Sequence, residues 1–397
     1  MGTLSTRNGR SVERLIVRLA EDLRARGALT DPRWERALHE VPRHLFVPDA
    51  AWFTASDARA PRGRFAIGDD PAAWLEAVYS DTSVIIQTDD GAGDPTSGTG
   101  TFSSSVSAPG IVFPFLELLD PREGERILEI GAGSGWTAAL LSWAAGDGGV
   151  TSIEIDPEVG ARAVANLAVT GFSPKVVIGD GVKGWPERAP YDGMHVTAGV
   201  TDIPMAWIEQ TRPGGVIVMP WHGNGMLGHR LRLVVADDAT ATGRFHGTAG
   251  YMMLREQRYN TRWSSHRHEE ATETKTRINP RTIAATDPGA HLMAAALAPR
   301  IAWHAVQEDT GYSLHLYELD DHDRTGSWAA CDHELGGDEA RVTQYGPRRL
   351  WDELSSAYRQ WVSLGSPSSD RFGMTVDPQG IWLWLDHPAG PTWRVPV

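Results

Sequence analysis

The middle of the chain alternates apolar runs of strand length with segments of helical periodicity. The apolar runs occupy residues 126–130, 150–154, 175–179, 193–197 and 215–219. Between the first three runs, apolar residues recur at helical spacing over 136–145 and 157–169. Strands that alternate with helices of this length favour right-handed crossovers and a mostly parallel sheet. The pattern therefore predicts a doubly wound α/β core.

The segment before this core contains two helical patterns and one stretch without a pattern. Leucine and isoleucine recur at helical spacing over residues 11–27, and a shorter helix is expected over 32–39. Residues 91–107 are rich in glycine, serine and threonine and show no periodicity. Such a composition predicts a mobile loop, and loops of this length are often functional.

Regularity fades after residue 255. Residues 260–290 are polar and rich in turn formers, which predicts a linker or an irregular connection. Apolar pieces at 301–303 and 381–385 and a helical pattern over 348–364 follow. Because eight of the 16 tryptophans lie after residue 260, this part has enough apolar area to fold. The expected domains are a larger α/β domain over 1–255 and a small α+β C-terminal domain over 256–397.

Three features of this C-terminal extension admit a functional explanation beside a structural one. Trp382 and Trp384 alternate along a predicted strand and share one face, where core packing is favoured over contact with a peptide. The histidines of segment 266–270 lack the partner motif of a zinc site, so a solvated turn is favoured. The acidic segment 320–323 lacks the downstream acid of a calcium loop and fits a hairpin turn. We expect no bound metal.

Charge and composition argue against several classes of protein. Hydrophobic residues make up 41% of the chain, enough for a folded core. A net charge of -14 argues against a nucleic-acid-binding surface, which needs clustered basic residues. Cys331 is the single cysteine, so no internal disulfide can form. Without an apolar signal core or a run of about 18 apolar residues, we expect a cytoplasmic protein that neither crosses a membrane nor binds nucleic acid.

The strongest chemical signal is the motif Leu128-Glu-Ile-Gly-Ala-Gly-Ser-Gly-Trp136, between a predicted strand and a predicted helix. Glycine lets the backbone turn sharply and approach a ligand, and the N-terminus of the helix offers unpaired N–H groups. A nucleotide-like cofactor fits such a turn. By itself the pattern would also suit a dinucleotide, or a tight connection without any ligand.

Acidic residues at the ends of three successive strands narrow the choice of cofactor. Glu129 precedes the glycines, Glu154 ends the next strand, and Asp180 follows the third. A carboxylate after the second strand can accept both hydrogen bonds of a ribose diol. Three acids suit the cationic sulfonium of S-adenosylmethionine and repel phosphates, whereas the alternative is that Glu154 and Asp180 are ordinary helix caps. The expected cofactor-binding residues are Glu129, Gly131, Ala132, Gly133, Gly135, Glu154, Ile155, Asp180 and Gly181.

Taken in order, the motifs of residues 11–255 resemble those of the protein-L-isoaspartate O-methyltransferase family. The shared marks are Val41-Pro42-Arg43-His44-Leu45-Phe46-Val47-Pro48, Tyr79-Ser80-Asp81, Ser105-Val106-Ser107-Ala108-Pro109, the glycine motif, Gly179-Asp180-Gly181 with Trp185, and Ala189-Pro190-Tyr191-Asp192. The resemblance implies a Rossmann-like methyltransferase fold and S-adenosylmethionine as methyl donor. It also implies a carboxylate of an isoaspartyl or aspartyl peptide as acceptor.

The resemblance also assigns two serines to the active site. Ser107 matches the serine that the family places there, and Ser105 stands where the family has threonine. A carboxylate acceptor is already ionised at pH 7, so methyl transfer to it requires no general base. Ser107 would therefore orient the acceptor. A role as acyl nucleophile is disfavoured, because no Gly-x-Ser-x-Gly elbow surrounds it.

Three departures from the family bear on the choice of acceptor. An insertion over 89–104 precedes the serine, Gly110 stands where the family commonly has histidine or tyrosine, and residues 256–397 follow where the repair enzymes stop. The extended architecture, with its segment 370–376, is similar to actinobacterial relatives that act on ribosomally made peptides.

Three functions are compatible with these observations. The sequence favours methylation of an Asp side chain in an already cyclised lanthipeptide, lasso peptide or graspetide precursor. That methylation would lead to an aspartimide or isoaspartate, and the extension would help to select the peptide. The second function is general repair of isoaspartyl damage, with a structural extension. The third is a binding module without catalysis, which the intact donor motif disfavours.

Overall fold

The computed structural model describes residues 6–55, 60–223, 227–259, 270–284, 287–319 and 326–396. The chain forms two compact units. The first comprises Met1–Thr197 with Ala206–Val218, and the second comprises Ala198–Met205 with Met219–Val397. This division lies before the boundary expected at residue 255, because strand β11 (Ala241–Thr248) pairs with β17 (Phe372–Asp377) of the extension.

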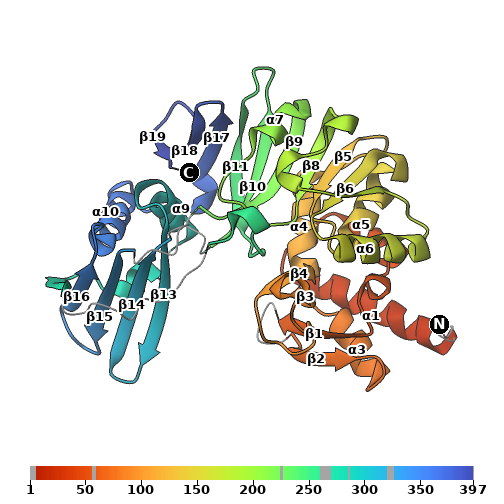
Figure 1. Cartoon of the computed structure of the whole chain (residues 1–397), viewed down its shortest axis with the longest axis horizontal. Helices are drawn as coiled ribbons and strands as arrows, with labels where there is room; N and C mark the ends of the chain where they lie inside the picture. Colours follow the sequence, from red (N-terminus) through yellow and green to blue (C-terminus); the bar gives the residue numbers. More distant parts are fainter. Residues whose placement is uncertain are drawn as a thin grey trace. The chain divides into compact units, whose positions relative to one another are not determined.

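The N-terminal part of the first unit is a small antiparallel sheet with helices beside it (Figure 1). The strand order β2-β1-β3-β4 is formed by Gly63–Ala66, Ala50–Ala55, Thr82–Thr88 and Phe102–Val106. The helices are α1 (Thr6–Ala25), α2 (Pro32–Glu40) and α3 (Pro71–Val78). The helices expected over 11–27 and 32–39 are thus confirmed. Asp31 caps α2, because its carboxylate accepts a hydrogen bond from the Arg33 N–H.

The segment expected to be a mobile loop over 91–107 contains regular structure. Its last part is strand β4, which pairs with β3. Before the strand, the backbone N–H of Asp89 donates to the Thr101 carbonyl, and the Thr101 N–H donates to the Asp89 carboxylate, both at 2.7 Å. Pro95 accepts a hydrogen bond from the Trp52 N–H at 3.2 Å. The prediction is wrong for 102–106, because a serine-rich strand shows no apolar alternation.

The rest of the first unit is the predicted α/β core (Figure 1). Its parallel strands follow the order β9-β8-β5-β6-β7. The elements are α4 (Pro109–Leu119), β5 (Ile127–Ile130), α5 (Trp136–Ala145), β6 (Val150–Glu154), α6 (Pro157–Thr170), β7 (Lys175–Ile178), β8 (Tyr191–Val196), α7 (Met205–Glu209) and β9 (Thr211–Trp221). Helix α4 packs on β8, α5 on β5 and β6, and α6 on β6 and β7. The fold is therefore the expected Rossmann-like α/β fold.

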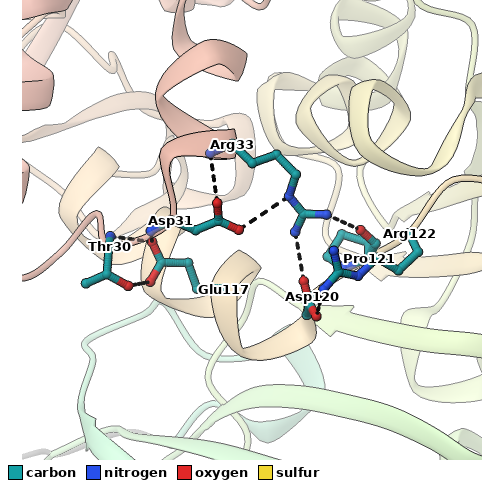
Figure 2. A network of polar contacts seen from close by, with 7 residues as sticks. All are labelled: Thr30, Asp31, Arg33, Glu117, Asp120, Pro121 and Arg122. Carbon is teal, nitrogen blue, oxygen red and sulfur yellow. Dashed lines mark hydrogen bonds and ion pairs between the residues drawn. The ribbon is translucent and has the colours of Figure 1, made fainter.

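A polar network joins the start of helix α2 to helix α4 (Figure 2). The Glu117 carboxylate accepts a hydrogen bond from the Thr30 N–H at 2.6 Å. Arg33 donates to the Pro121 carbonyl at 2.8 Å and to the Asp120 carboxylate at 2.9 Å. These acceptors lie at the C-terminal end of α4, so the network fixes that end of the helix to α2.

The second unit is built from antiparallel strands and three helices. One sheet contains, in order, β10 (His229–Val235), β11, β17, β18 (Gly380–Leu385) and β19 (Thr392–Val395). A five-stranded sheet has the order β12-β16-β15-β14-β13, formed by Thr272–Thr276, Ala340–Tyr345, Trp328–Glu334, Gly311–Glu318 and Ile301–Glu308. The helices are α8 (Pro280–Ala284), α9 (Pro288–Leu297) and α10 (Leu350–Ser363).

The core of the extension confirms its predicted α+β character. Trp351 and Leu354 of α10 share one buried apolar cluster with Leu314 and Leu316 of β14. The stretch 260–290 was expected to be a linker, but its described part contains β12 and α8. That expectation fails because a short polar strand at a sheet edge has no apolar periodicity to reveal it.

The features of the extension that had two explanations are resolved only in part. Trp384 is 3% exposed, which supports core packing, whereas Trp382 is half-buried with the Arg394 guanidinium 5.9 Å from its ring centre. The segments 266–269 and 320–323 lie outside the described residues, so the expected turns stay predictions. Across the described ranges, no helix is long and apolar enough to cross a membrane.

Candidate active site

The glycine motif forms the turn between strand β5 and helix α5. The N–H groups of Gly131 and Ala132 both donate to the Ile153 carbonyl on the next strand, at 2.8 Å and 3.0 Å. Gly131 has a φ of 96°, and a Cβ added there would lie 2.5 Å from the Thr197 Oγ1. No side chain caps α5, whose N-cap is Gly135. Glycine is therefore required at residue 131 by its positive φ and by the closeness of Thr197, and the N-terminus of α5 keeps its N–H groups without a side-chain cap.

Glu154 binds the glycine turn directly. Its side chain accepts hydrogen bonds from the Gly133 N–H at 2.9 Å and from the Asp156 N–H at 3.1 Å, and the residue is 7% exposed. The Gly133 N–H lies in the turn after β5, and the Asp156 N–H follows the end of β6. The carboxylate is therefore held at the carboxyl edge of the sheet. Ile155, which follows, is 38% exposed and presents an apolar side chain beside this acid. The assignment of Glu154 to the ribose stays a prediction.

The Asp180-Gly181 pair lies beside the same turn. A Cβ on Gly181 would lie 2.5 Å from Cγ2 of Ile130, the last residue of β5. Asp180 accepts a hydrogen bond from the Val182 N–H at 3.0 Å, so it also acts as the local cap foreseen as an alternative. The Gly181 carbonyl accepts from the Trp207 indole at 2.9 Å. The structure thus brings the first, second and third strand ends together.

Glu129 lies differently from the other two acids. It is fully buried, and its carboxylate accepts a hydrogen bond from the Ser152 hydroxyl at 2.5 Å. Burial raises the pKa of Glu129 to about 8, with Ser152 opposing and Glu154 adding to the shift. His195 Nδ1 lies 4.0 Å away on β8, and burial lowers the pKa of His195 to about 3. At pH 7 the two side chains are therefore not an ion pair, and Glu129 is buried on one face of the sheet between its register partners Ser152 and His195.

Ser105 lies next to the glycine turn, and Ser107 follows it two residues later. Ser105 is in β4, and its carbonyl would lie 3.3 Å from a Cβ on Gly133. Ser107 is in the short connector between β4 and α4, where its carbonyl accepts a hydrogen bond from Arg43 at 3.1 Å. The strand that leads to Ser107 therefore runs directly against the turn expected to bind the donor.

Gly110, which differs from the family, lies against the side chain of Asp81, a residue of the shared motif Tyr79-Ser80-Asp81. Its N–H donates to the Asp81 carboxylate at 2.6 Å, and a Cβ at this position would lie 2.5 Å from Asp81 Oδ2. The carboxylate of Asp81 also pairs with Arg26 at 2.9 Å, and Asp81 is 7% exposed. Asp81 occupies the space that a larger side chain at residue 110 would need.

Sequence reasoning missed residues that connect the two sides of the site. Gln87 at the end of β3 donates to the Asp156 carboxylate at 2.8 Å and accepts from the Ser103 hydroxyl at 3.0 Å. Asp156 also caps α6 by accepting from the Glu158 and Val159 N–H groups. Periodicity could not reveal Gln87, because its partners are remote in sequence. Arg43 belongs to one of the family motifs, but that motif assigns no role to it.

These residues fit a nucleoside with a positively charged tail. The glycine backbone allows close approach, Glu154 is fixed beside it, and the fold places Asp180 at the neighbouring strand end. The fold and the site define an S-adenosylmethionine-dependent methyltransferase.

The chain belongs to the protein-L-isoaspartate O-methyltransferase family. The family model described as "Protein-L-isoaspartate(D-aspartate) O-methyltransferase (PCMT)" matches residues 58–227, which include the glycine motif and Ser107. The protein-L-isoaspartate O-methyltransferase of Methanopyrus kandleri is 36% identical over 241 residues, covering 60% of this chain and 89% of that protein. The Pyrococcus horikoshii enzyme is 32% identical over 238 residues, with 60% and 91% covered. The protein is thus a carboxyl O-methyltransferase of proteins or peptides that uses S-adenosylmethionine.

One solved structure bears on the extension. A protein-L-isoaspartate O-methyltransferase with 21% sequence identity has a TM-score of 0.53, covering 94% of this chain and 100% of its own. Since residues 256–397 are more than a third of the chain, a match of this extent includes most of the extension. The extension therefore has a counterpart in the fold of that structure.

Proposed function

We propose that this enzyme methylates the free carboxylate of isoaspartyl residues in damaged peptides and proteins. The observation that carries the proposal is the match over 89% of the Methanopyrus kandleri enzyme, whose name states this activity, at 36% identity. The family model also spans both the donor turn and Ser107. The role of the extension is then structural, in keeping with its own buried core.

The residues of the site suffice for this chemistry. When bound, S-adenosylmethionine supplies a methyl group on a positively charged sulfur. The glycine turn and Glu154 hold the nucleoside, and Ser107 orients the acceptor carboxylate toward the turn. Because the acceptor is already ionised at pH 7, no residue has to remove a proton. Catalysis then depends on holding the acceptor oxygen about 3 Å from the methyl carbon and in line with the bond that breaks.

The product accounts for a repair role without a second enzyme. A methyl ester has a better leaving group than a free acid, because methoxide leaves more readily than hydroxide. The next backbone nitrogen can therefore close a five-membered succinimide and release methanol. Water then opens the ring to aspartyl or isoaspartyl products.

A second candidate function rests on the acceptor side of the site. Gly110 and the insertion over 89–104 both differ from the family there, and both are held in place by hydrogen bonds. These differences favour an acceptor other than a generic isoaspartyl residue. The candidate is the Asp side chain of a cyclised ribosomal peptide, whose methylation leads to an aspartimide, and the extension would contact that peptide.

A comparison of four peptides separates the two candidates. kcat/KM is measured for an isoaspartyl hexapeptide, its aspartyl isomer, a cyclised aspartyl peptide and the linear form of that peptide. Repair predicts that the isoaspartyl peptide leads by at least tenfold, about 1.4 kcal/mol of transition-state binding. A tenfold lead for the cyclised peptide would instead support tailoring. The Glu154→Ala variant serves as the control for dependence on the donor.

A further inference from the structure

Arg43 is a buried arginine between the two sides of the site. It has no exposed surface and lies in the short helix η1 (Arg43–Phe46). Its guanidinium donates to four backbone carbonyls from three separate segments of the chain. These acceptors are Val78 at 2.6 Å, Thr82 at 2.7 Å, Ser107 at 3.1 Å and Val106 at 3.3 Å.

Two of the four carbonyls belong to the connector that carries Ser107. Val106 ends strand β4, and Ser107 follows it before helix α4 begins at Pro109. The other two carbonyls lie at the end of α3 and at the start of β3, the partner strand of β4. One guanidinium therefore sets where β4 ends relative to its neighbours, and with it the position of the serine.

The same guanidinium also contacts the donor turn. Its central carbon lies 5.2 Å from the centre of the Trp136 ring, and Trp136 is the first residue of α5 after the glycines. The Trp136 indole donates to the Val41 carbonyl at 3.3 Å, two residues before Arg43. The short segment 41–43 therefore contacts the glycine turn through Trp136 and the acceptor connector through Arg43.

We propose that Arg43 is a positioning residue for methyl transfer, which sets Ser107 at the correct place relative to the donor turn. The inference rests on the proposed role of Ser107 as the orienting group. It does not depend on which peptide is the acceptor. Burial lowers the pKa of Arg43 to about 10, so the side chain keeps its charge at pH 7.

Only arginine suits this position. Its planar fork carries five N–H donors that can contact acceptors on two sides while its face stacks on an aromatic ring. Lysine would keep the charge, but it has one point of contact on a flexible stem. It would leave some of these carbonyls unpaired and would lose the stacking. We therefore expect Arg43→Lys to fold with a displaced connector.

The test compares Arg43→Lys with a matched arginine that is remote from Ser107. Arg33 is the control, because its guanidinium carbon also lies 4.9 Å from the centre of an aromatic ring, that of Trp34. Arg33 also donates to a backbone carbonyl, that of Pro121 at 2.8 Å (Figure 2). It does so at the other end of α4. Arg43→Lys should lower kcat at saturating donor and acceptor at least tenfold, while donor Kd changes less than threefold. Arg33→Lys should lower the melting temperature only.

A double-mutant cycle with Ser107→Ala separates positioning from general damage. If Arg43 acts through Ser107, Arg43→Lys should lower kcat at least tenfold in the wild type and less than twofold in the Ser107→Ala background. Equal losses in both backgrounds, or an unchanged kcat in the wild type, would overturn the proposal. The acceptor is whichever peptide the wild type methylates, so this result is separate from the choice between repair and tailoring.

A second variant covers the case in which Arg43→Lys does not fold. Trp136→Phe keeps an aromatic ring but removes the indole N–H that donates to Val41. It should lower kcat about threefold in the wild type and leave it unchanged in the Ser107→Ala background. A loss of kcat that is the same in both backgrounds would argue against the link that segment 41–43 makes.

Discussion

The donor half and the acceptor half of this active site are assembled in different ways. The donor half is formed at the carboxyl ends of the neighbouring strands β5, β6 and β7. There the Glu154 carboxylate accepts a hydrogen bond from the Gly133 N–H at 2.9 Å. The acceptor half is a short connector whose position depends on side chains far away in sequence. Arg43 contacts its Ser107 carbonyl, and Asp81 contacts the Gly110 N–H.

The comparison explains where this chain resembles its family and where it departs. The glycine turn takes its hydrogen bonds from the ends of neighbouring strands, namely Ile153 and Glu154 of β6 and Thr197 after β8. A connector held by distant groups moves when any of those groups changes. The differences at Gly110 and in the insertion over 89–104 both fall in the acceptor half. Substrate choice can therefore change while donor binding stays the same.

The largest expected effect concerns the buried acid of strand β5. The folded protein keeps Glu129 protonated up to a pKa of about 8, whereas the unfolded chain releases that proton near 4.5. Relative to Glu129→Gln, the wild type is therefore fully stable below pH 4.5 and loses stability as the pH rises to 8. We expect a difference of about 5 kcal/mol across this range, measured by denaturant unfolding at several pH values.

The control for this titration is Glu158→Gln, because Glu158 is an exposed acid on the neighbouring helix α6. Its stability should follow the wild type at every pH. A Glu129→Gln variant that tracks the wild type across the same range would show that Glu129 is ionised in the folded protein.

The next effect tests the glycine turn itself. In Gly131→Ala the new Cβ would lie 2.5 Å from the Thr197 Oγ1, which is held by hydrogen bonds to the Ile130 and Gly131 carbonyls. We expect donor binding to weaken by about 2 to 3 kcal/mol, because the new side chain strains the turn and keeps its backbone from approaching the donor closely. Calorimetry with S-adenosylmethionine measures it.

Gly171→Ala is the matched control for that variant. Gly171 ends helix α6 with a φ of 81°, and a Cβ added there would have no atom within 4 Å. The Gly171→Ala variant should lose about 1 kcal/mol of folding stability and keep the wild-type donor affinity. If both variants bind the donor normally, the glycine turn is not the donor site.

A smaller effect is expected from the acid that contacts the turn. Glu154→Ala should weaken S-adenosylmethionine binding by about 1 to 3 kcal/mol, the usual cost of lost charge-assisted hydrogen bonds. The melting temperature of the variant in the absence of donor separates binding from folding. Unchanged donor affinity in calorimetry would remove Glu154 from the ribose site.

The smallest expected effect is that of a substitution in the acceptor half. It tests most directly whether the donor half and the acceptor half act separately. Ser107→Ala should lower kcat about tenfold, or 1.4 kcal/mol, while donor affinity stays near the wild type. The physical reason is that Ser107 lies in the connector and not in the turn. Loss of donor binding in a folded Ser107→Ala protein would contradict this separation of the two halves.

Most of the α/β core was predictable because its strands and helices carry strong periodicity. The helix over 136–145 and the strand over 150–154 agree with the structure residue by residue. Strand β4 was not predictable, since Phe102 and Val106 enclose three serines with no apolar alternation. The edge strand β12 was missed for the same reason, because its side chains are polar and mostly exposed.

The sequence by itself determined the family and the cofactor class, and it predicted the donor turn, because the glycines and the acids at strand ends act through local backbone geometry. It did not determine how the acceptor half is held. The tertiary structure alone showed that Arg43 joins Ser107 to Trp136 and that Asp81 fills the space beside Gly110. It also showed that Glu129 is fully buried. The physical reason is that such contacts join residues far apart in the chain. Local hydrophobic periodicity does not predict contacts of this kind.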